Sequence, residues 1–185
     1  MNKKLIATVF ATSLSLFGMT SAQAEETATD VTAPGGTVHF VGQVVNAGCS
    51  VASDSLDFTV YLDQVRATHL ATAGTAAGQP KSFEIHLVDC DASIVKTAAV
   101  TFTGQTDSDL PAALANTAGA GAAKHVALQL YGPDSKAVDM GVKSSSIAVL
   151  DGENTIPMSV DYIATDAAGE AGSVEATATF HMNYA

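Results

Sequence analysis

The chain has no tryptophan, only two cysteines and only eight basic residues among its 185 residues. The missing tryptophan excludes the buried Trp that marks antibody-type domains. The eight Lys and Arg face nineteen Asp and Glu, and this acidic balance disfavours phosphate backbones and anionic lipid surfaces as partners. After residues 5–17, no segment is apolar over the length of about 20 residues that a membrane-spanning helix needs. We therefore expect a soluble protein that binds no nucleic acid.

Motifs that carry catalysis are also missing. The sequence contains no G-x-S-x-G elbow, no H-E-x-x-H pair and no glycine loop of the phosphate-binding type. Its five histidines are dispersed along the chain rather than grouped. We expect neither enzyme activity nor a cofactor nor a metal site, and interaction is left as the function that these residues favour.

The first 24 residues have the pattern of a secretory signal peptide. Lys3 and Lys4 form a positive start, residues 5–17 are mostly apolar, and Ala22-Gln23-Ala24 is a small-x-small cleavage site. We expect cleavage after Ala24, with cleavage after Ala22 as the alternative. The exported chain then begins at Glu25, and its length of about 160 residues suits one domain.

Cys49 and Cys90 both follow the signal segment. In an exported protein, two cysteines favour a disulfide, which would close a loop worth roughly 4 kcal/mol in the chain-entropy model. A metal pair and a reactive thiol are the alternatives. A metal site needs further ligands at short spacing, and none lie near either cysteine.

The last fourteen residues alternate between apolar and polar side chains. Successive side chains of a strand point to opposite faces, so this pattern predicts an amphipathic strand that continues almost to the final residue. The apolar positions are Val174, Ala176, Ala178, Phe180, Met182 and Tyr184. Chain ends fray unless something holds them, so the terminal strand must pair with a neighbour in this chain or in another one.

The rest of the chain is punctuated as short strands between turn clusters. We expect strands at residues 37–45, 56–62, 83–88, 98–102, 126–130, 146–150 and 156–162. Pro157 should limit pairing within the last of these. Residues 111–116 are the one candidate for a helical turn. Many short strands with regular turn signals favour an all-β fold of the sandwich type.

Residues 25–36 form a polar leader that ends in Pro34-Gly35-Gly36. Its composition is that of a flexible tail. However, one alternating face carries the small side chains of Thr27, Thr29, Val31 and Ala33, and threonine and valine favour extended backbone. A disordered tail and a spare strand are both open on the residues alone.

Several motifs in order resemble the major subunits of bacterial type 1 fimbriae, which are pilins of the chaperone–usher pathway. They are G-G-T-V-H-F-V-G-Q-V-V-N-A-G-C-S-V at 35–51, L-x-Q-V-R-x-x-x-L at 62–70, F-E-I-H-L-V-D-C-D at 83–91, N-T-I-P at 154–157, and the terminal stretch with Gly172 and penultimate Tyr184. The resemblance covers the whole chain after the signal segment.

This resemblance implies an immunoglobulin-like β-sandwich that is incomplete because its final strand comes from another molecule. A periplasmic chaperone fills the resulting groove first, and the N-terminal extension of the next subunit replaces the chaperone's strand. Residues 25–36 would be the donor-strand extension, with Thr27, Thr29, Val31 and Ala33 facing inward, and residues 37–185 the pilin domain. Glu25, Glu26, Asp30 and Pro34 depart from the more neutral family pattern, and Pro34 has no N–H to give to a ladder.

The resemblance also assigns the other site residues. Cys49 and Cys90 would form the family disulfide, and the groove strand that pairs with the chaperone would carry Gly172, Val174, Ala176, Ala178, Phe180, Met182 and Tyr184. The implied partners are further copies of this chain, a periplasmic chaperone, an outer-membrane usher, and tip adaptor and adhesin subunits.

We therefore predict an exported structural subunit of a cell-surface fimbrial rod that supports adhesion. A minor or adaptor pilin of the same pathway is one alternative. The other is an exported carbohydrate-binding β-sandwich, which would be a stable monomer with a complete sheet.

Overall fold

The computed structural model describes residues 34–42, 44 and 47–185 of the chain. The chain divides into two units, residues 1–42 and 43–185. In the first unit, residues 34–42 are solvent-exposed and have no regular secondary structure. All the helices and strands of the described residues lie in the second unit, which is the domain discussed below.

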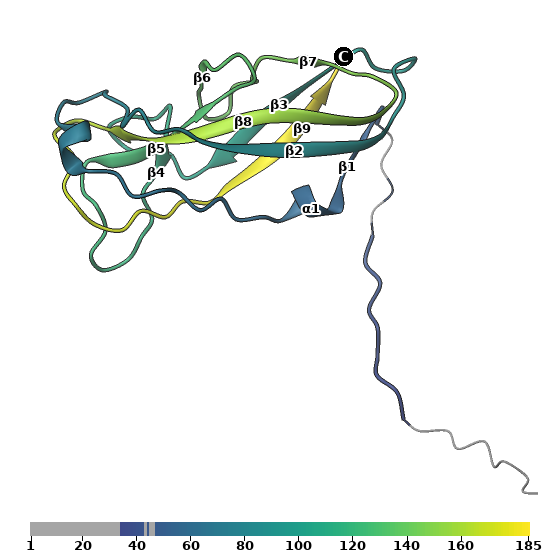
Figure 1. Ribbon diagram of the computed structural model, residues 1–185, viewed down its shortest axis with the longest axis horizontal. Helices are drawn as coiled ribbons and strands as arrows, with labels where there is room; N and C mark the ends of the chain where they lie inside the picture. The colour runs from purple at the N-terminus through teal and green to yellow at the C-terminus, as the bar shows by residue number, and fades with distance from the viewer. Residues whose placement is uncertain (1–33, 43, 45–46) are drawn as a thin grey trace, which may run out of the picture. The chain divides into compact units, whose positions relative to one another are not determined.

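Two antiparallel sheets make up this domain (Figure 1). The larger sheet has the order β1-β2-β8-β5-β4, and β6 also pairs with β5. Its strands are β1 (Ser50–Val51), β2 (Lys81–Cys90), β4 (Leu114–Ala115), β5 (Val126–Tyr131), β6 (Ala137–Val138) and β8 (Gly152–Ala164). The smaller sheet has the order β7-β3-β9, with β3 (Thr97–Gly104), β7 (Ile147–Ala148) and β9 (Ala178–Tyr184). The predicted all-β sandwich is confirmed.

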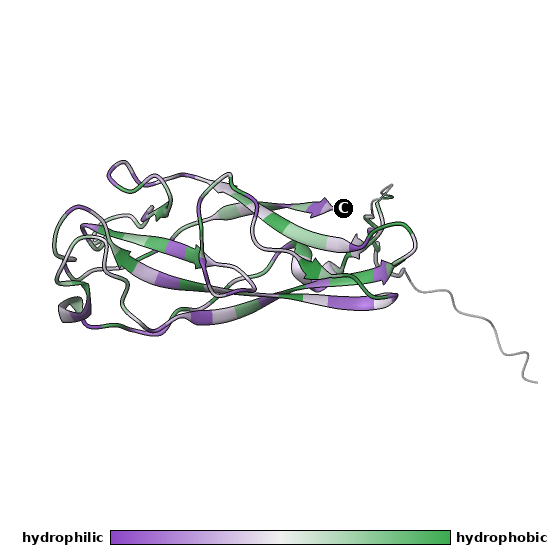
Figure 2. Cartoon of the chain, turned by 90° about the horizontal axis from the view of Figure 1, so that it is seen from above, coloured by the Kyte–Doolittle hydropathy of each residue, from purple (hydrophilic) through white to green (hydrophobic). Residues whose placement is uncertain are grey.

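The hydrophobic core contains side chains from both sheets. Its largest fully buried side chains are Ile85 and Leu87 of β2, Ile156 of β8 and Val100 of β3. In β2, and in β8 up to Val160, the buried residues alternate with exposed or half-buried ones, as a strand with one face on the core requires. Hydrophobic and hydrophilic residues accordingly follow one another along the strands (Figure 2). Ile85 pairs directly with Ile156 in the ladder, so the long β2–β8 pair carries the centre of the core.

Four of the expected elements differ in the structure. The terminal strand is shorter than expected, because only Ala178–Tyr184 of residues 172–184 forms β9. The expected strand at 37–45 is absent from residues 37–42 and 44, which carry no strand. The expected strand at 56–62 is wrong, because Ser53–Leu56 forms a short helix, α1, and residues 57–62 have no ladder partner. The expected helical turn at 111–116 is also wrong, because Leu114–Ala115 is β4, which pairs with β5.

Pro157 lies where β8 has a partner on one side only. At this residue β8 pairs with β2, through Glu84, while its pairing with β5 starts at Ser159. The missing N–H of proline is tolerated at an edge position of this kind. The long strand therefore continues through Pro157, and the proline marks the point where its second partner ends.

The expected disulfide between Cys49 and Cys90 is present, and both cysteines belong to the main core. It links the residue that precedes β1 to the last residue of β2, over a sequence separation of 41. The carbonyl of the neighbouring Gly48 accepts a hydrogen bond from the Asp91 N–H at 2.9 Å. The start of the domain is thus held both covalently and by the backbone.

Replacing Cys49 and Cys90 together by alanine should lower the free energy of unfolding by about 2–5 kcal/mol, because the unfolded chain loses its loop constraint. Urea denaturation of the isolated subunit, with the oxidised parent as reference, measures this difference. Equal unfolding midpoints for the variant and the oxidised parent would show that the disulfide does not contribute to stability.

Candidate functional site

The C-terminal strand β9 lies at the edge of the smaller sheet (Figure 1). It pairs with β3 from Ala98↔Tyr184 to Gly104↔Ala178, and no strand among residues 47–185 pairs with its other edge. The final residue is held as well: the Ala185 carbonyl accepts hydrogen bonds from the N–H groups of Lys96 and Thr97 at 2.7 and 2.9 Å. The neighbour that the terminal strand requires therefore lies in the same chain on one side, and its other edge is open.

The predicted alternation of the terminal stretch is present in the structure. The side chains of the apolar positions are half-buried and contact the main core: Val174, Ala176, Ala178, Phe180, Met182 and Tyr184. The polar side chains between them are exposed, except that of Asn183, whose amide donates to the Thr101 hydroxyl at 2.9 Å. The apolar face of β9 is thus turned toward the core but only partly covered by it.

Residues 57–65 form a second segment with an incompletely covered apolar side. Val60 and Leu62 are half-buried against the same core, and the Phe58 side chain is 39% exposed. Within residues 47–185, no backbone hydrogen bond joins residues 58–65 to another backbone group. Backbone N–H and C=O groups need partners, so this extended segment must bind water or a strand from elsewhere.

Four aromatic rings connect the two segments. Phe58 contacts Phe83 of β2, Phe83 contacts Phe102 of β3, and Phe102 contacts Phe180 of β9, with ring centroids 5.9, 6.5 and 6.2 Å apart. We call the surface between residues 57–65 and β9, with Phe83 and Phe102 as its floor, the acceptor groove. Both of its sides are extended backbone with free hydrogen-bonding groups, and its floor is apolar.

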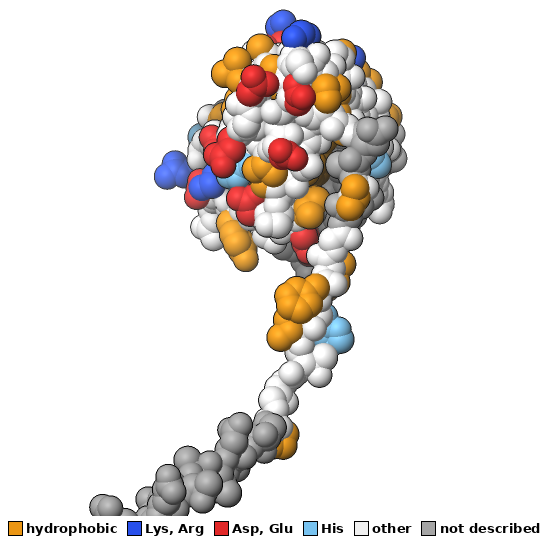
Figure 3. All heavy atoms as spheres, turned by 90° about the vertical axis from the view of Figure 1, so that its right-hand side faces the viewer, with side chains coloured by type: hydrophobic (Ala, Val, Ile, Leu, Met, Phe, Trp, Pro, Cys, Tyr) orange, Lys and Arg blue, Asp and Glu red, His pale blue; other side chains and the backbone are white. Residues whose placement is uncertain are grey.

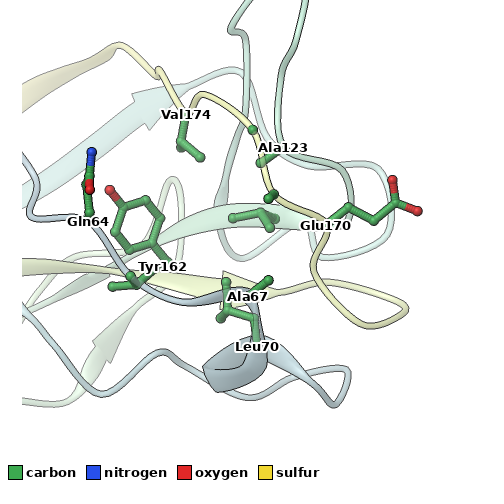
Figure 4. Close-up of a pocket in the computed structure, with 11 residues that line it drawn as sticks. Gln64, Ala67, Leu70, Ala123, Tyr162, Glu170 and Val174 are labelled. Carbon is green, nitrogen blue, oxygen red and sulfur yellow. The ribbon is translucent and has the colours of Figure 1, made fainter.

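A cavity of about 240 Å³ lies where residues 64–70 approach residues 170–174, at one end of the acceptor groove (Figure 4). We call it the end pocket. Its lining residues are Gln64, Val65, Ala67, Leu70, Ala123, Val126, Tyr162, Glu170, Ala171, Gly172 and Val174. In Figure 4, Val174, Leu70 and the Tyr162 ring point into the cavity, whereas Glu170 points away from it.

Tyr162 contributes both an apolar ring and a fixed polar group to this pocket. Its hydroxyl donates to the Asp63 carbonyl at 3.2 Å, which ties β8 to the start of the pocket wall. Burial raises the pKa of the Tyr162 phenol, and the nearby Asp63 and Asp161 carboxylates act in the same direction. The phenol therefore stays protonated at neutral pH and keeps donating.

Gly172 lies against the backbone of Ala122 and Ala123. A Cβ at position 172 would come within 2.2 Å of the Ala123 nitrogen and 2.4 Å of the Ala122 carbonyl carbon. Ser173 forms a parallel bridge with Ala122, so the two backbones run side by side here. Only glycine permits this close approach, which brings Val174 onto the pocket.

The sequence-predicted groove-strand residues thus lie together along one edge, with Gly172 and Val174 at the end pocket and the other five in or before β9. The predicted donor residues Thr27, Thr29, Val31 and Ala33 lie outside the described residues. The opposite side of the acceptor groove, formed by residues 57–65, and its aromatic floor were not predicted from the sequence. The alternation of Phe58, Val60 and Leu62 was visible, but nothing in it told a strand without a partner from an ordinary one.

The described part of the N-terminal region carries large apolar side chains in solvent (Figure 3). The exposed fractions of Val38, Phe40, Val41 and Val44 are 70%, 92%, 97% and 100%. Val38, Phe40 and Val44 share one phase of an extended chain with Gly42, and Val41 lies in the opposite phase. Exposure of this size is costly in isolation, so these side chains are available to a partner.

Asp54, Glu84 and His86 form an ion-pair cluster that fixes α1, the helix just before residues 57–65. The His86 ring lies 2.9 Å from the Asp54 carboxylate of α1 and 3.4 Å from the Glu84 carboxylate. The hydrogen bond with Asp54, followed by that with Glu84, raises the pKa of His86 above its ordinary value of 6.5. The same hydrogen bond with His86 lowers the pKa of Asp54. The cluster anchors α1 to β2.

No group of three or more His, Cys, Asp or Glu side chains within the described ranges is placed to hold a metal ion. None of the described helices has the length and apolar character needed to cross a membrane.

An incomplete β-sandwich with an open C-terminal edge strand is the domain of a pilin. The chain belongs to the fimbrial protein family, whose pattern matches residues 38–185. It is 41% identical over 188 residues to the type-1 fimbrial protein A chain of Escherichia coli, covering 100% of both chains. It is 36% identical over 183 residues to the laminin-binding fimbrial subunit ElfA of Escherichia coli O157:H7, covering 98% of this chain and 99% of that one.

Solved structures agree with this assignment. The crystal structure of the P pilus rod subunit PapA matches 75% of this chain and 100% of its own, with a TM-score of 0.62 and 25% sequence identity. A chaperone–usher pilus structure matches 85% of this chain and 100% of its own, with a TM-score of 0.66 and 27% identity. The protein is an exported structural subunit of a surface fimbria, and it polymerises with other subunits. Membership of this family of structural subunits argues against an enzyme.

Replacing Gly172 by alanine should lower the free energy of unfolding by about 1–3 kcal/mol, because the backbone of residues 122–123 would have to move. Gly119→Ala is the matched control. Gly119 lies in the loop that contains Ala122 and Ala123, and nothing lies within 4 Å of a Cβ built there. Urea denaturation compares the two variants. Equal effects would rule out close backbone approach as the reason for glycine at 172.

His86→Gln should destabilise the domain more at pH 5.5 than at pH 8. Because the folded pKa of His86 is raised, its contribution is complete below pH 6.5 and is lost as pH rises through the folded pKa. Thermal unfolding at several pH values measures the difference between parent and variant. A difference that does not change with pH would contradict the ion-pair assignment.

Proposed function

We propose that this subunit polymerises by strand addition: the N-terminal extension of one copy fills the acceptor groove of the next. The observation that carries the proposal is the acceptor groove itself, which has two extended sides with unpaired backbone and an apolar floor between them. A strand placed there would pair with both sides and cover the exposed parts of Phe58, Phe83 and Phe180. Ladder hydrogen bonds would supply affinity, and alternating side chains would set the register.

The exposed apolar residues of the extension support the same proposal from the donor side. Burying each of Val38, Phe40 and Val44 in an apolar groove would contribute roughly 1.5–3 kcal/mol relative to leaving it in water. One copy therefore has both a surplus strand and an incomplete sheet. Such a contact uses different surfaces on the two copies and does not close on itself, so it generates a filament.

The donor strand has two candidate segments. The first is residues 27–33, with Thr27, Thr29, Val31 and Ala33 facing inward. The second is residues 38–44, and its larger apolar side chains are in the described structure and exposed. The two sets have opposite phases, and Pro34-Gly35-Gly36 lies between them, so one continuous strand cannot turn both toward the groove. The exposed side chains favour the second segment as the groove filler, with residues 27–33 as the alternative.

The same groove requires protection before assembly. An open apolar groove beside an unpaired strand edge is an aggregation hazard. A periplasmic chaperone that lends a strand would remove it during export, and an outer-membrane usher would be the place where the next subunit's extension replaces that strand. Tip adaptor and adhesin subunits would begin the filament. The alternative of a monomeric carbohydrate-binding sandwich is disfavoured, because it requires a complete sheet.

Val38→Asp should abolish filament formation, because it would bury a charge in the groove, whereas Val41→Asp should leave filaments intact. The two residues are of the same type and both are exposed in the described chain, but they lie in opposite phases. Negative-stain microscopy of material sheared from the cell surface gives the readout, and periplasmic yield controls for folding.

Val31→Asp tests the other candidate segment, residues 27–33. If it blocks assembly while Val38→Asp does not, residues 27–33 are the donor strand rather than residues 38–44. Normal filaments from a chain that carries both Val31→Asp and Val38→Asp would overturn strand addition by this extension altogether.

A further inference from the structure

One wall of the end pocket is not part of a sheet. Residues 172–177 precede β9 and lie against the loop of residues 116–123. Three backbone hydrogen bonds join the two: Ala123 N–H to the Ser173 carbonyl at 2.8 Å, Thr117 N–H to the Glu175 carbonyl at 2.7 Å, and Ser173 N–H to the Gly121 carbonyl at 2.9 Å. The position of Gly172 and Val174, which line the pocket, therefore depends on this loop.

Asn116 ties the same two segments together through its side chain. Its amide nitrogen donates to the carbonyls of Ala123 and Ser173, both at 3.0 Å. Its amide oxygen accepts from the N–H groups of Ala118 at 3.1 Å and Glu175 at 3.0 Å. An asparagine amide has two donor hydrogens and one oxygen with two acceptor sites, so Asn116 uses its full hydrogen-bonding capacity here.

The partners of Asn116 lie directly behind the pocket. Ala123 is a lining residue, and Ser173 and Glu175 flank the lining residue Val174. Asn116 itself does not line the cavity. It can influence a strand that enters the pocket only by fixing the wall that this strand contacts.

We propose that Asn116 is a positioning residue that holds the end pocket in the shape required by an incoming donor strand. The inference rests on the strand addition proposed above. A preformed wall spares the incoming strand the cost of ordering residues 172–177 on binding. Without Asn116, the wall loses the side-chain hydrogen bonds at the Ser173 carbonyl and the Glu175 N–H, while the Thr117 hydroxyl still donates to the Glu175 carbonyl at 3.1 Å and β9 keeps its ladder with β3. The loss therefore affects strand capture more than the stability of the sandwich.

The test measures binding of a dye-labelled peptide with the sequence of residues 25–46, by fluorescence anisotropy. The host is the mature chain, residues 25–185, with Val31→Asp and Val38→Asp so that its own extension does not compete. Asn116→Ala should slow peptide association by about tenfold, since two side-chain hydrogen bonds to residues 173–175 are lost. Amide hydrogen exchange should become faster at Ser173 and Glu175 and remain unchanged at Ile85.

Asn154→Ala is the matched control. Asn154 also holds a loop through both ends of its amide, accepting from the Leu150 N–H at 2.9 Å and donating to the Leu150 carbonyl at 2.7 Å, and it lies away from the pocket lining. Its replacement should leave peptide association within about twofold of the parent. Equal slowing by both replacements would mean that a general loss of stability is responsible and would overturn the inference.

Asn116→Asp distinguishes the hydrogen bonds that the Asn116 side chain accepts from those that it donates. It also replaces the alanine variant as the test if that variant does not fold. A carboxylate can still accept from Ala118 and Glu175, but it cannot donate to Ala123 and Ser173. The rate at which the peptide associates with the Asp variant, divided by the rate for the parent at the same pH, should be low at neutral pH. This ratio should recover below about pH 4, where a protonated carboxyl regains one donor. A ratio near one at neutral pH, with native hydrogen exchange, would overturn the inference. If the peptide fails to bind even the host with Asn116 intact, strand addition itself is wrong.

Discussion

The incomplete covering of one apolar surface is the constraint on which the rest of this structure depends. The centre of the sandwich is closed, since Ile85, Val100 and Ile156 have no contact with solvent. At the acceptor groove, in contrast, residues 57–65 and β9 turn apolar side chains toward the core without a strand between them. Both segments also leave backbone groups unpaired within the described domain. Water can satisfy those groups but not the apolar side chains, so the groove favours an occupant that supplies both a ladder and side chains.

The N-terminal extension has apolar side chains that no sheet covers, which complements the uncovered groove of the domain. Phe40 and its valine neighbours are exposed and have no sheet of their own among the described residues, while the domain has a sheet edge without a strand. A protein with both features on different surfaces gains stability from its neighbour, and each added copy presents the same two features again. Membership of the fimbrial protein family agrees with this physical picture. In the proposed strand addition, burial and backbone pairing rather than covalent links would hold neighbouring copies together.

Side-chain hydrogen bonds anchor the ends of the two segments that border the acceptor groove, whereas the groove between them is open. On the side of β9, Asn116 donates to the Ser173 carbonyl and accepts from the Glu175 N–H, both at 3.0 Å. At the start of the other side, the His86–Asp54 pair holds α1 against β2. The segments beside the missing strand are therefore fixed by side-chain hydrogen bonds at their ends. Preorganisation of this kind lowers the ordering cost when a strand enters.

The sequence by itself determined the strands whose apolar side chains alternate and whose partners are in the same chain. It determined β2, β3, β5, β8 and β9 in their correct phase, and the signs of export favoured the Cys49–Cys90 disulfide. It did not reveal that residues 57–62 lack a ladder, because alternation depends on side chains whereas pairing depends on which backbone lies alongside. Only the tertiary structure brought residues 57–65, β9 and the loop holding Asn116 around one groove. Those segments are far apart in sequence, and their contacts are set by the packing of the two sheets rather than by local propensity.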